Sequence, residues 1–466
     1  MNPVVLLEFN ELCPSLMAEF IAQEKLHNFK KLRDSSASDI TKAGEPQNLL
    51  EPWIQWVNVH TGVPYTEHGI SQLGENDKIK QPAVWDLLSD AGKSVWVCGS
   101  MNVNCSPSIK GAVLPDPWSR DAVIKPAAMQ TFYDFVKKQV QEHSNASASF
   151  GLSDYLKFLA FMLSNGLSVS TVRSTIKQLT GERKEGKKWR RAFILDLLLF
   201  DVFASIYKKE HPAFSTFFLN STAHMQHVYW RNMQPELFVL QPTDAEQREY
   251  SNAILEGYIH MDALVGRILS LVGPNTTLIF ATALSQQPFL RYEAAGGKRI
   301  YRPTDIPAFA KWAGIQNLKG SNPVMAEQFW LEFDSPAAVD AAAARLDAIL
   351  INGEPAVKII KEGNSIFCGF SVRSKLEKDA KLSSPGSTVP FFDIFYEIEG
   401  LKSGMHHPEG MLWVRDQQFP PASFQQRVPL EAVAPTILDM FSVDVPAHMH
   451  SPSLLAHEAA PALQPA

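Results

Sequence analysis

The chain has 466 residues, of which 45% are hydrophobic and 20% are charged, and its formal net charge is -6. This ordinary globular composition excludes disordered, collagen-like and coiled-coil proteins, and the acidic balance predicts no nucleic-acid partner. The four cysteines form no CxxC pair, which excludes a cysteine zinc site and a disulfide framework. We therefore expect reduced thiols and a cytoplasmic protein.

The first residues predict a buried strand instead of an export signal. Val4–Leu7 is apolar, no basic region precedes it, and Glu8 ends it. The best transmembrane candidate, residues 192–207, is too short for a span and contains Asp196 and Asp201. We expect that segment to be a buried or interfacial helix.

Short apolar strands then alternate with helices along the chain. This order is typical of the α/β class, with a mostly parallel sheet sandwiched by helices, whose ligands bind beyond the carboxyl ends of the strands. The predicted strands are Val4–Glu8, Ser94–Cys98, Thr216–Leu219 and Thr276–Thr282, and the predicted helices are Pro14–Leu32, Trp85–Ala91 and Gln247–Val272.

Two regions interrupt the alternation, leaving core segments at 1–120, 213–290 and 401–466. Residues 121–212 predict a helical insertion. Its basic run, 182–191, is either a solvated loop, a contact with an anionic substrate, or part of a weak membrane-surface contact through residues 182–207. Residues 291–400 predict a small α+β cap, with strands at Gln328–Phe333, Ala356–Ile360 and Ser365–Val372, a helix at Pro336–Leu350 and a loop at Lys381–Thr388.

Five motifs follow one another along the predicted core. They are VVLLEFNELCP near the start, HTGVP with HGI at 60–70, YIHMDALVGRI at 258–268, HPEG at 407–410, and LEAVAPTILD with VDVP at 430–446. In this order they resemble the alkaline phosphatase superfamily, in particular its type I phosphodiesterase/nucleotide pyrophosphatase branch. The resemblance implies that family's fold and a two-metal site, usually zinc, with a Thr or Ser nucleophile for phosphoryl or sulfuryl transfer.

Most of the ligands that the resemblance implies are replaced in this chain. Only His227 and His407 match imidazole positions, and the second metal position keeps no carboxylate or imidazole. The standard two-metal mechanism therefore cannot run on these residues. The replacements are Asn10 for the first aspartate, Pro52 at the nucleophile, Ala223 for a further aspartate and Thr282-Ala283-Leu284-Ser285 for a Ser-Asp-His-Gly stretch.

The residues that follow the predicted strands are rich in amides, imidazoles and indoles. Such side chains are typical of sugar or nucleotide sites. Trp53 and Trp56 are equally consistent with one buried helix face, since they are three residues apart. The predicted substrate-binding residues are Trp53, Gln55, Trp56, His224, Ser285, Gln286 and His406.

A divergent hydrolase of a phosphate, phosphodiester-like, or related ester is the first of three functions that stay open. Its single divalent ion, zinc or manganese, would be held by His227, His407 and a carboxylate, for which we predict Glu11 over Glu8 and Glu51.

The other two functions use no such metal chemistry. One is a catalytically inactive relative that binds a phosphorylated or glycosyl ligand, or a partner. The other is a metal-free transferase or lyase with Glu51 or His60 as general base. His60 is equally consistent with a hydrogen bond in the core. The predicted catalytic residues are Asn10, Glu51 and His60.

Overall fold

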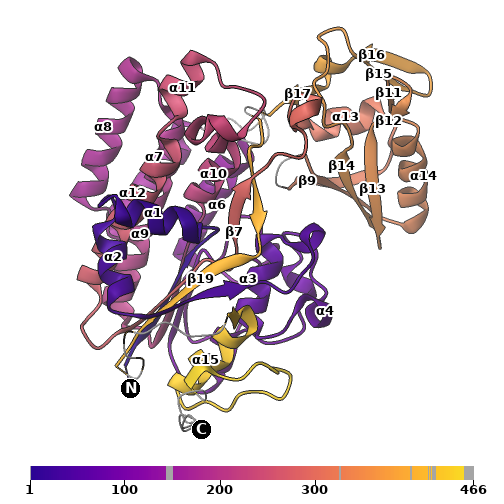
Figure 1. Cartoon of the computed structure of the whole chain (residues 1–466). Helices are drawn as coiled ribbons and strands as arrows, with labels where there is room; N and C mark the ends of the chain where they lie inside the picture. The colour runs from indigo at the N-terminus through magenta and orange to yellow at the C-terminus, as the bar shows by residue number, and fades with distance from the viewer. Residues whose placement is uncertain are drawn as a thin grey trace, which may run out of the picture.

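The computed structural model describes residues 2–142, 151–324, 327–398, 401–417, 419, 421 and 427–455. Its central sheet has eight strands in the order β20-β2-β19-β6-β1-β5-β3-β4 (Figure 1). β19 is antiparallel to both of its neighbours, and the other described pairings in this sheet are parallel. The strands are β1 (Val4–Phe9), β2 (Ala37–Lys42), β3 (Val95–Cys98), β4 (Gly111–Leu114), β5 (Phe214–Leu219), β6 (Thr277–Ala281), β19 (Glu409–Arg415) and β20 (Val428–Pro429).

Helices cover both faces of this sheet, and the alternation of side chains along β1 shows why. Val4 and Leu6 enter the core on one face, while Val5, Leu7 and Phe9 enter the core on the other. One face packs against α3 (Pro52–Thr61), α5 (Val84–Asp90) and α15 (Val433–Met440), and the other against α1 (Pro14–Ala22), α2 (His27–Asp34), α10 (Ser221–Met233) and α12 (Ala253–Leu271). The predicted fold class, a mostly parallel sheet sandwiched by helices, is confirmed.

Three predicted elements differ from the structure. The single helix expected over 14–32 is broken between α1 and α2, where Glu24 has a φ of 56° and Lys25 N–H donates to the Phe20 carbonyl. The helix expected over 247–272 is two helices, α11 (Asp244–Tyr250) and α12. The loop expected at 381–388 is a hairpin of β15 (Lys381–Ser384) and β16 (Ser387–Pro390), because Gly386, with a φ of 88°, allows a tight turn.

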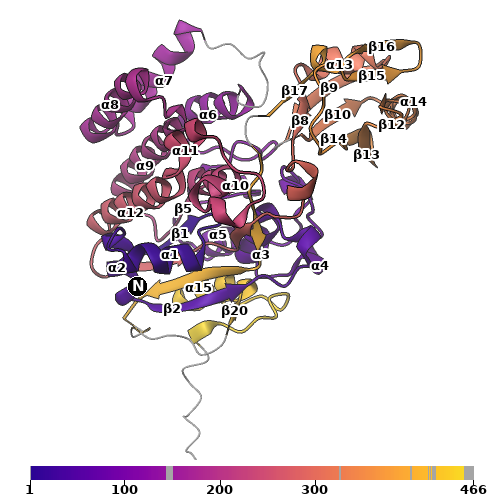
Figure 2. The ribbon, with the colours of Figure 1, turned by 45° about the horizontal axis from the view of Figure 1, so that its top comes forward.

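The helical insertion lies along one edge of the molecule (Figure 2). It contains α6 (Gln130–Glu142), α7 (Leu152–Ser164), α8 (Val169–Glu185) and α9 (Arg191–Glu210). Phe200, Val202, Phe203 and Ile206 of α9 are buried, which matches the expectation of a buried helix. Within the described part of the chain, no helix combines the length and apolar character needed to cross a bilayer.

The cap has its own hydrophobic core and lies on the other side of the molecule from the insertion (Figure 1). Two four-stranded sheets, β13-β14-β10-β9 and β12-β11-β15-β16, pack with α13 (Ile306–Trp312) and α14 (Pro336–Asp347). The cap strands not yet given are β9 (Leu318–Pro323), β10 (Phe329–Phe333), β11 (Leu350–Ile351), β12 (Glu354–Pro355), β13 (Val357–Glu362) and β14 (Ser365–Phe370). Its neck consists of two strand pairs, β8 (Tyr301–Pro303) with β17 (Phe395–Glu397), and β7 (Ser285–Pro288) with β18 (Gly404–His407). The second pair carries the neck directly to the carboxyl edge of the central sheet.

Candidate metal centre

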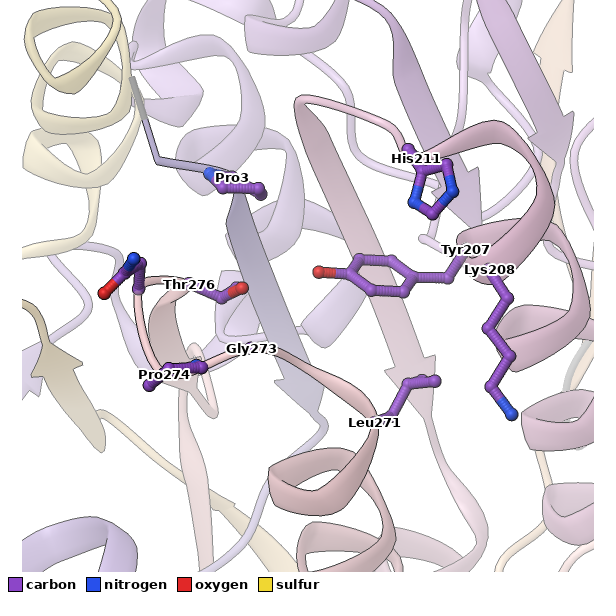
Figure 3. A pocket seen from close by; sticks show the side chains of 9 residues that line it. Pro3, Tyr207, Lys208, His211, Leu271, Gly273, Pro274 and Thr276 are labelled. Carbon is purple, nitrogen blue, oxygen red and sulfur yellow. The ribbon is translucent and has the colours of Figure 1, made fainter.

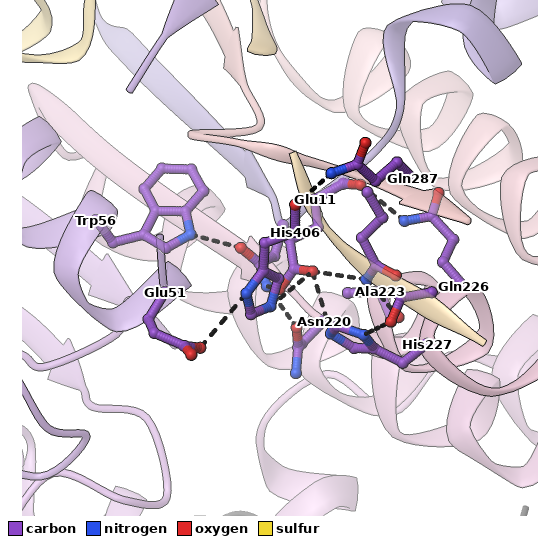
Figure 4. A network of polar contacts seen from close by, with 12 residues as sticks. Glu11, Glu51, Trp56, Asn220, Ala223, Gln226, His227, Gln287 and His406 are labelled. Carbon is purple, nitrogen blue, oxygen red and sulfur yellow. Dashed lines mark hydrogen bonds and ion pairs between the residues drawn. The ribbon is translucent and has the colours of Figure 1, made fainter. Parts of the chain in front are cut away.

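Three metal-ligating side chains from distant parts of the sequence meet at the end of β1 (Figure 4). Glu11 follows β1, His227 lies on α10, and His406 lies on β18. Glu11 Oε2 is 3.2 Å from His227 Nε2 and 3.5 Å from His406 Nε2, and one ligand atom from each residue lies within 4.8 Å of the others. Among the described residues this is the only such group of three.

The spacing of these atoms fits one ion. Two ligand atoms bound tetrahedrally at about 2.1 Å lie about 3.4 Å apart, close to both distances from the Glu11 oxygen. Two imidazoles and one carboxylate form a donor set typical of zinc, manganese or iron. The donor chemistry and the geometry therefore both suit a divalent metal.

Glu11 is held rigidly in an unusual backbone conformation. Its φ of 60° lies in the left-handed region, which a non-glycine residue occupies only when its surroundings hold it there. Gln226 Nε2 donates to the Glu11 carbonyl at 2.7 Å, and Asn10 Nδ2 donates to Oε1 at 2.8 Å. Gln286 Nε2 donates to Oε2 at 2.6 Å. These bonds aim the carboxylate at the two histidines.

Charge states in the cluster suit metal binding. Burial alone would raise the pKa of Glu11, but the neighbouring His406 and His227 and the hydrogen bond from Gln286 lower it overall. Burial lowers the pKa of His406, which keeps its ring neutral. A metal binds ionised carboxylates and neutral imidazoles, so neither group has to lose a proton near neutral pH.

The His227 ring is oriented by its second nitrogen, and the second nitrogen of His406 faces Glu51. His227 Nδ1 lies 3.0 Å from the Gly404 carbonyl, an arrangement that selects the tautomer leaving Nε2 free to bind. His406 Nδ1 lies 3.4 Å from Glu51 Oε2. Gly404 permits this approach, because a Cβ at that position would overlap the Gln226 backbone oxygen and Gln286 Oε1. β18 can therefore pass this close to α10 only with glycine there.

Asn10 stands where the family resemblance places the first aspartate, and its amide is fully engaged. Its Oδ1 accepts from Trp56 Nε1 at 2.8 Å, and its Nδ2 donates to Glu11 and to Asn220 Oδ1. The Trp56 indole is completely buried behind it. This side of the cluster is thus closed by an amide whose oxygen and nitrogen are both in hydrogen bonds and by an indole, which is a donor only.

Glu51 lies at the open side of the cluster, at the N-cap of α3. Its side chain is 28% exposed, whereas the His406 side chain beside it is 4% exposed. Burial raises the pKa of the Glu51 carboxyl to about 7, against the charges of Lys402 and Lys298, which lower it. A carboxyl of this kind can donate or accept a proton near neutral pH.

Two lysines lie side by side at the neck of the cap, where the chain enters and leaves it. Lys298 and Lys402 form an antiparallel bridge, with Lys402 N–H donating to the Lys298 carbonyl at 3.4 Å. Burial lowers the pKa of the Lys298 amine to about 8, and the charge of Lys402 acts in the same direction. Both cations act electrostatically on Glu51, which places positive charge next to the open side of the cluster.

The structure brings together only part of the predicted site. Asn10, Glu11, Glu51, His227, Gln286 and His406 converge. His407 does not join the described metal cluster. It follows His406 on β18, where successive side chains point to opposite faces, and its Nδ1 lies 3.3 Å from the Glu409 N–H. In this geometry His406, predicted as a substrate contact, takes the ligand position predicted for His407.

The other predicted residues lie in the core or on the surface. His60 is buried and bonds to Glu8 Oε1 at 2.7 Å, so it has no access to a substrate. Trp53 Nε1 donates to the Ser71 carbonyl, and the Trp53 and Trp56 rings belong to the hydrophobic core. These three side chains are thus packed in the core, and their predicted catalytic and substrate-binding roles stay predictions. Gln55 and Ser285 are also buried, and His224 is exposed on α10.

Sequence reasoning gave no role to Lys298 and Lys402, and it left Gln226 without an assigned function. The lysines are more than a hundred positions apart and belong to no motif, so only the closure of the neck pairs them. Gln226 precedes His227 directly, and its Oε1 accepts from the buried Tyr258 hydroxyl at 2.7 Å. The polar run after β5 was the signal that pointed to this helix.

A separate cavity of about 350 Å³ lies at the opposite edge of the sheet (Figure 3). It is lined by Pro3, which precedes β1, by Thr276, which precedes β6, and by His211, Tyr207 and Lys208. Ligands of parallel sheets bind at the carboxyl ends of the strands, and this cavity is at the amino ends. The described residues lining it include no carboxylate, so it offers no comparable metal site.

The matches of this chain to known proteins come from solved structures. No family model and no curated protein matches the chain. Solved structures do overlap with it, and three of them are wild-type alkaline phosphatase PafA (TM-score 0.46, 12% identity, 97% of this chain and 98% of that one), murine ectonucleotide pyrophosphatase/phosphodiesterase 5 (0.43, 8%, 97% and 98%) and phosphonoacetate hydrolase from Sinorhizobium meliloti 1021 with phosphonoformate (0.40, 10%, 93% and 94%).

Two of these names also name the superfamily and the branch that the sequence motifs resemble. At TM-scores below 0.5, neither the activities nor the ligands of these proteins transfer to this chain. The chemistry of the site has to be argued from its own residues.

Proposed function

We propose that this chain hydrolyses a phosphate or related ester with one divalent metal ion held by Glu11, His227 and His406. The observation that carries the proposal is the convergence of their three ligand atoms at distances that suit a single ion. Zinc and manganese both fit this donor set. When bound, such an ion supplies Lewis acidity and lowers the pKa of a coordinated water.

The ligand set favours hydrolysis over purely structural metal binding. One carboxylate and two neutral imidazoles contribute a single negative charge, so a divalent ion would keep a net charge of +1 toward an anionic ester. Three protein ligands also leave a coordination position open, as in catalytic zinc sites. The turn that faces the cluster carries Glu51 and Pro52 and no hydroxyl, which supports direct attack by water over a covalent intermediate.

Glu51 is our candidate for proton transfer during hydrolysis. Its carboxyl lies next to His406 and is the more exposed of the two side chains, so it faces the space a substrate would occupy. We assign it the transfer of a proton to the leaving oxygen or from the attacking water. Lys298 and Lys402, at the cap neck, would hold the anionic group of the substrate through charge-assisted contacts.

The test measures binding and turnover in the same preparations. Chelator-treated protein is reloaded with zinc or manganese, and the ion is counted before p-nitrophenyl phosphate and its bis-ester are supplied. His227→Ala should lose the ion and at least about a hundredfold in kcat/KM. Glu51→Gln should keep the ion and lose about a hundredfold in kcat. His450→Ala, whose side chain is 68% exposed on the surface, is the control.

The outcome also separates the other functions. A protein that binds one ion and hydrolyses neither ester nor related phosphonates or sulfates would contradict the hydrolase proposal in favour of a binding role. Turnover that survives chelation and the His227→Ala change would contradict the metal centre in favour of metal-free chemistry.

A further inference from the structure

Exposed apolar side chains gather on the hairpin of α7 and α8, which we call the apolar hairpin (residues 152–185). α8 is 17 residues long, and Thr171 is its only buried residue among those whose side chains are described. Exposed fractions elsewhere in the hairpin reach 85% at Val169 and 76% at Leu152. The full set is Leu152, Tyr155, Leu156, Leu159 and Leu163 on α7, and Val169, Val172, Ile176 and Leu179 on α8.

The spacing of these residues places them on one face of each helix. On α8 they follow one another at intervals of three, four and three residues, which is the repeat of a single helical stripe. α7 buries its other face through Phe158, which stacks on Phe135 of α6 with a centroid distance of 3.8 Å. On each helix the exposed stripe is therefore an apolar surface that the described part of the fold does not cover.

Positive charge surrounds this surface. Residues 151–191 contain nine Lys or Arg and three Asp or Glu, a net charge of +6 in a chain whose total is -6. Lys157, Arg173 and Lys177 are exposed within the hairpin itself. Arg190 and Lys187 beyond it pair with Glu256, and Arg191 pairs with Glu182. An apolar stripe flanked by exposed cations matches the headgroup region of an anionic lipid bilayer.

We infer that the apolar hairpin docks this protein onto the surface of a membrane that contains anionic lipids. The contact is interfacial, since no described helix is long and apolar enough to span a bilayer. Charge favours a lipid surface over a symmetric contact with a second copy of this chain, because two facing hairpins would bring the same net positive charge together. Outside the hairpin, the exposed large apolar side chains of the described residues are Leu237, Val239, Ile259, Leu290, Ile360 and Phe392. The surface lies in the helical insertion, on the far side of the molecule from the cap (Figures 1 and 2).

The experiment is co-sedimentation of the full chain with vesicles of phosphatidylcholine, with or without about 30% phosphatidylserine. Val169→Asp/Ile176→Asp changes two side chains of α8 that are 85% and 57% exposed. Val239→Asp/Ile360→Asp makes the same chemical changes at 77% and 53% exposure outside the hairpin and is the matched control. A third variant, Arg173→Gln/Lys177→Gln, removes charge and leaves the stripe intact.

We expect binding to phosphatidylserine vesicles that is at least about tenfold tighter than to pure phosphatidylcholine and that weakens with salt. The Val169→Asp/Ile176→Asp variant should lose at least about tenfold, the charge variant about tenfold with a flatter salt dependence, and the control less than about twofold. Circular dichroism should show all variants folded, because every changed side chain is exposed.

Three results would overturn the inference. One is the absence of binding of the unchanged protein to phosphatidylserine vesicles at low salt. Another is equal losses in the hairpin variant and its matched control. Self-association that disappears in Val169→Asp/Ile176→Asp, without vesicle binding, would also overturn it and would make the hairpin a protein–protein interface.

Discussion

Glu8 and Glu11 stand three residues apart at the end of β1, and each carboxyl group contacts imidazole nitrogen. Glu8 bonds to His60 Nε2 at 2.7 Å and to Ser100 Oγ at 2.7 Å, with both members of the Glu8–His60 pair sealed in the core. Glu11 faces two histidines at 3.2 and 3.5 Å, and the His227 side chain is 22% exposed. The same residue types therefore form a closed pair in one place and an open cluster in the other.

The difference shows how burial and partner number separate a structural pair from a candidate reactive site. In the Glu8–His60 pair a single imidazole contacts the carboxylate, both side chains are buried, and Trp56 and Trp85 pack against the ring of His60. In the Glu11 cluster two imidazoles face one carboxylate oxygen, at distances close to the edges of a metal polyhedron. Substitutions should therefore affect stability at the Glu8–His60 pair and metal binding at the Glu11 cluster.

His60→Ala should give the largest loss of stability. It leaves the fully buried Glu8 carboxyl without its imidazole partner and opens a cavity beside Trp56, which costs about 3–5 kcal/mol in unfolding free energy. Urea denaturation measures this loss. The folded variant should still bind one ion per chain. A folded variant without the ion would show that the Glu8–His60 pair and the Glu11 cluster are not independent.

A third buried imidazole, His68, should make stability depend on pH. Its Nε2 donates to Asn58 Oδ1 at 2.7 Å, and its Nδ1 accepts from the Ile70 N–H at 3.0 Å, an arrangement that requires the neutral ring. Burial lowers the pKa of His68 from 6.5 to about 4. Since the unfolded chain binds the proton first, this stabilisation is complete above pH 6.5 and is lost as the pH falls toward 4, by about 3 kcal/mol.

The check is the unfolding free energy of the unchanged protein and of His68→Gln between pH 7 and pH 4. The difference between the two curves should shrink as the pH falls. Parallel curves over that range would contradict the assigned tautomer and leave His68 with a packing role alone.

Gly404→Ala should weaken metal binding by about ten- to a hundredfold with a smaller effect on folding. The added methyl group overlaps the Gln226 carbonyl and Gln286 Oε1, which pushes β18 away from α10 and removes the carbonyl that orients His227. Calorimetric titration with zinc measures the affinity. Gly369→Ala, whose Cβ would lie 3.9 Å from Gln328, is the matched control within the other described strands.

Much of the fold was predictable because it depends on local patterns. The largely apolar strands β1, β5 and β6 and their following helices indicated a parallel sheet, and the edge where ligands bind followed from that. The helix break at Glu24 and the hairpin at Gly386 were not predicted. Both depend on residues with positive φ in a turn, which the periodicity of hydrophobic residues does not indicate. The tight turn Pro385-Gly386 in a polar stretch has the same composition as a loop.

The site was only partly predictable, because tertiary pairing completes it. Glu11 and His227 follow strands and were identified from that position. The choice between His406 and His407 depends on the register of β18 against β7, which pairs His406 with Gln286 and turns His407 to the other face. A one-residue shift would exchange them, and the sequence contains no signal that fixes this register.

The adjacent residues His406 and His407 provide the most direct test of the metal centre. Chelator-treated His406→Ala and His407→Ala are dialysed against zinc or manganese, and bound ion is counted by mass spectrometry beside the unchanged protein. The geometry predicts one ion per chain for the unchanged protein and for His407→Ala, and at least about a hundredfold weaker binding for His406→Ala. Loss of the ion in His407→Ala with retention in His406→Ala, or no ion bound by the unchanged protein, would contradict the proposed centre.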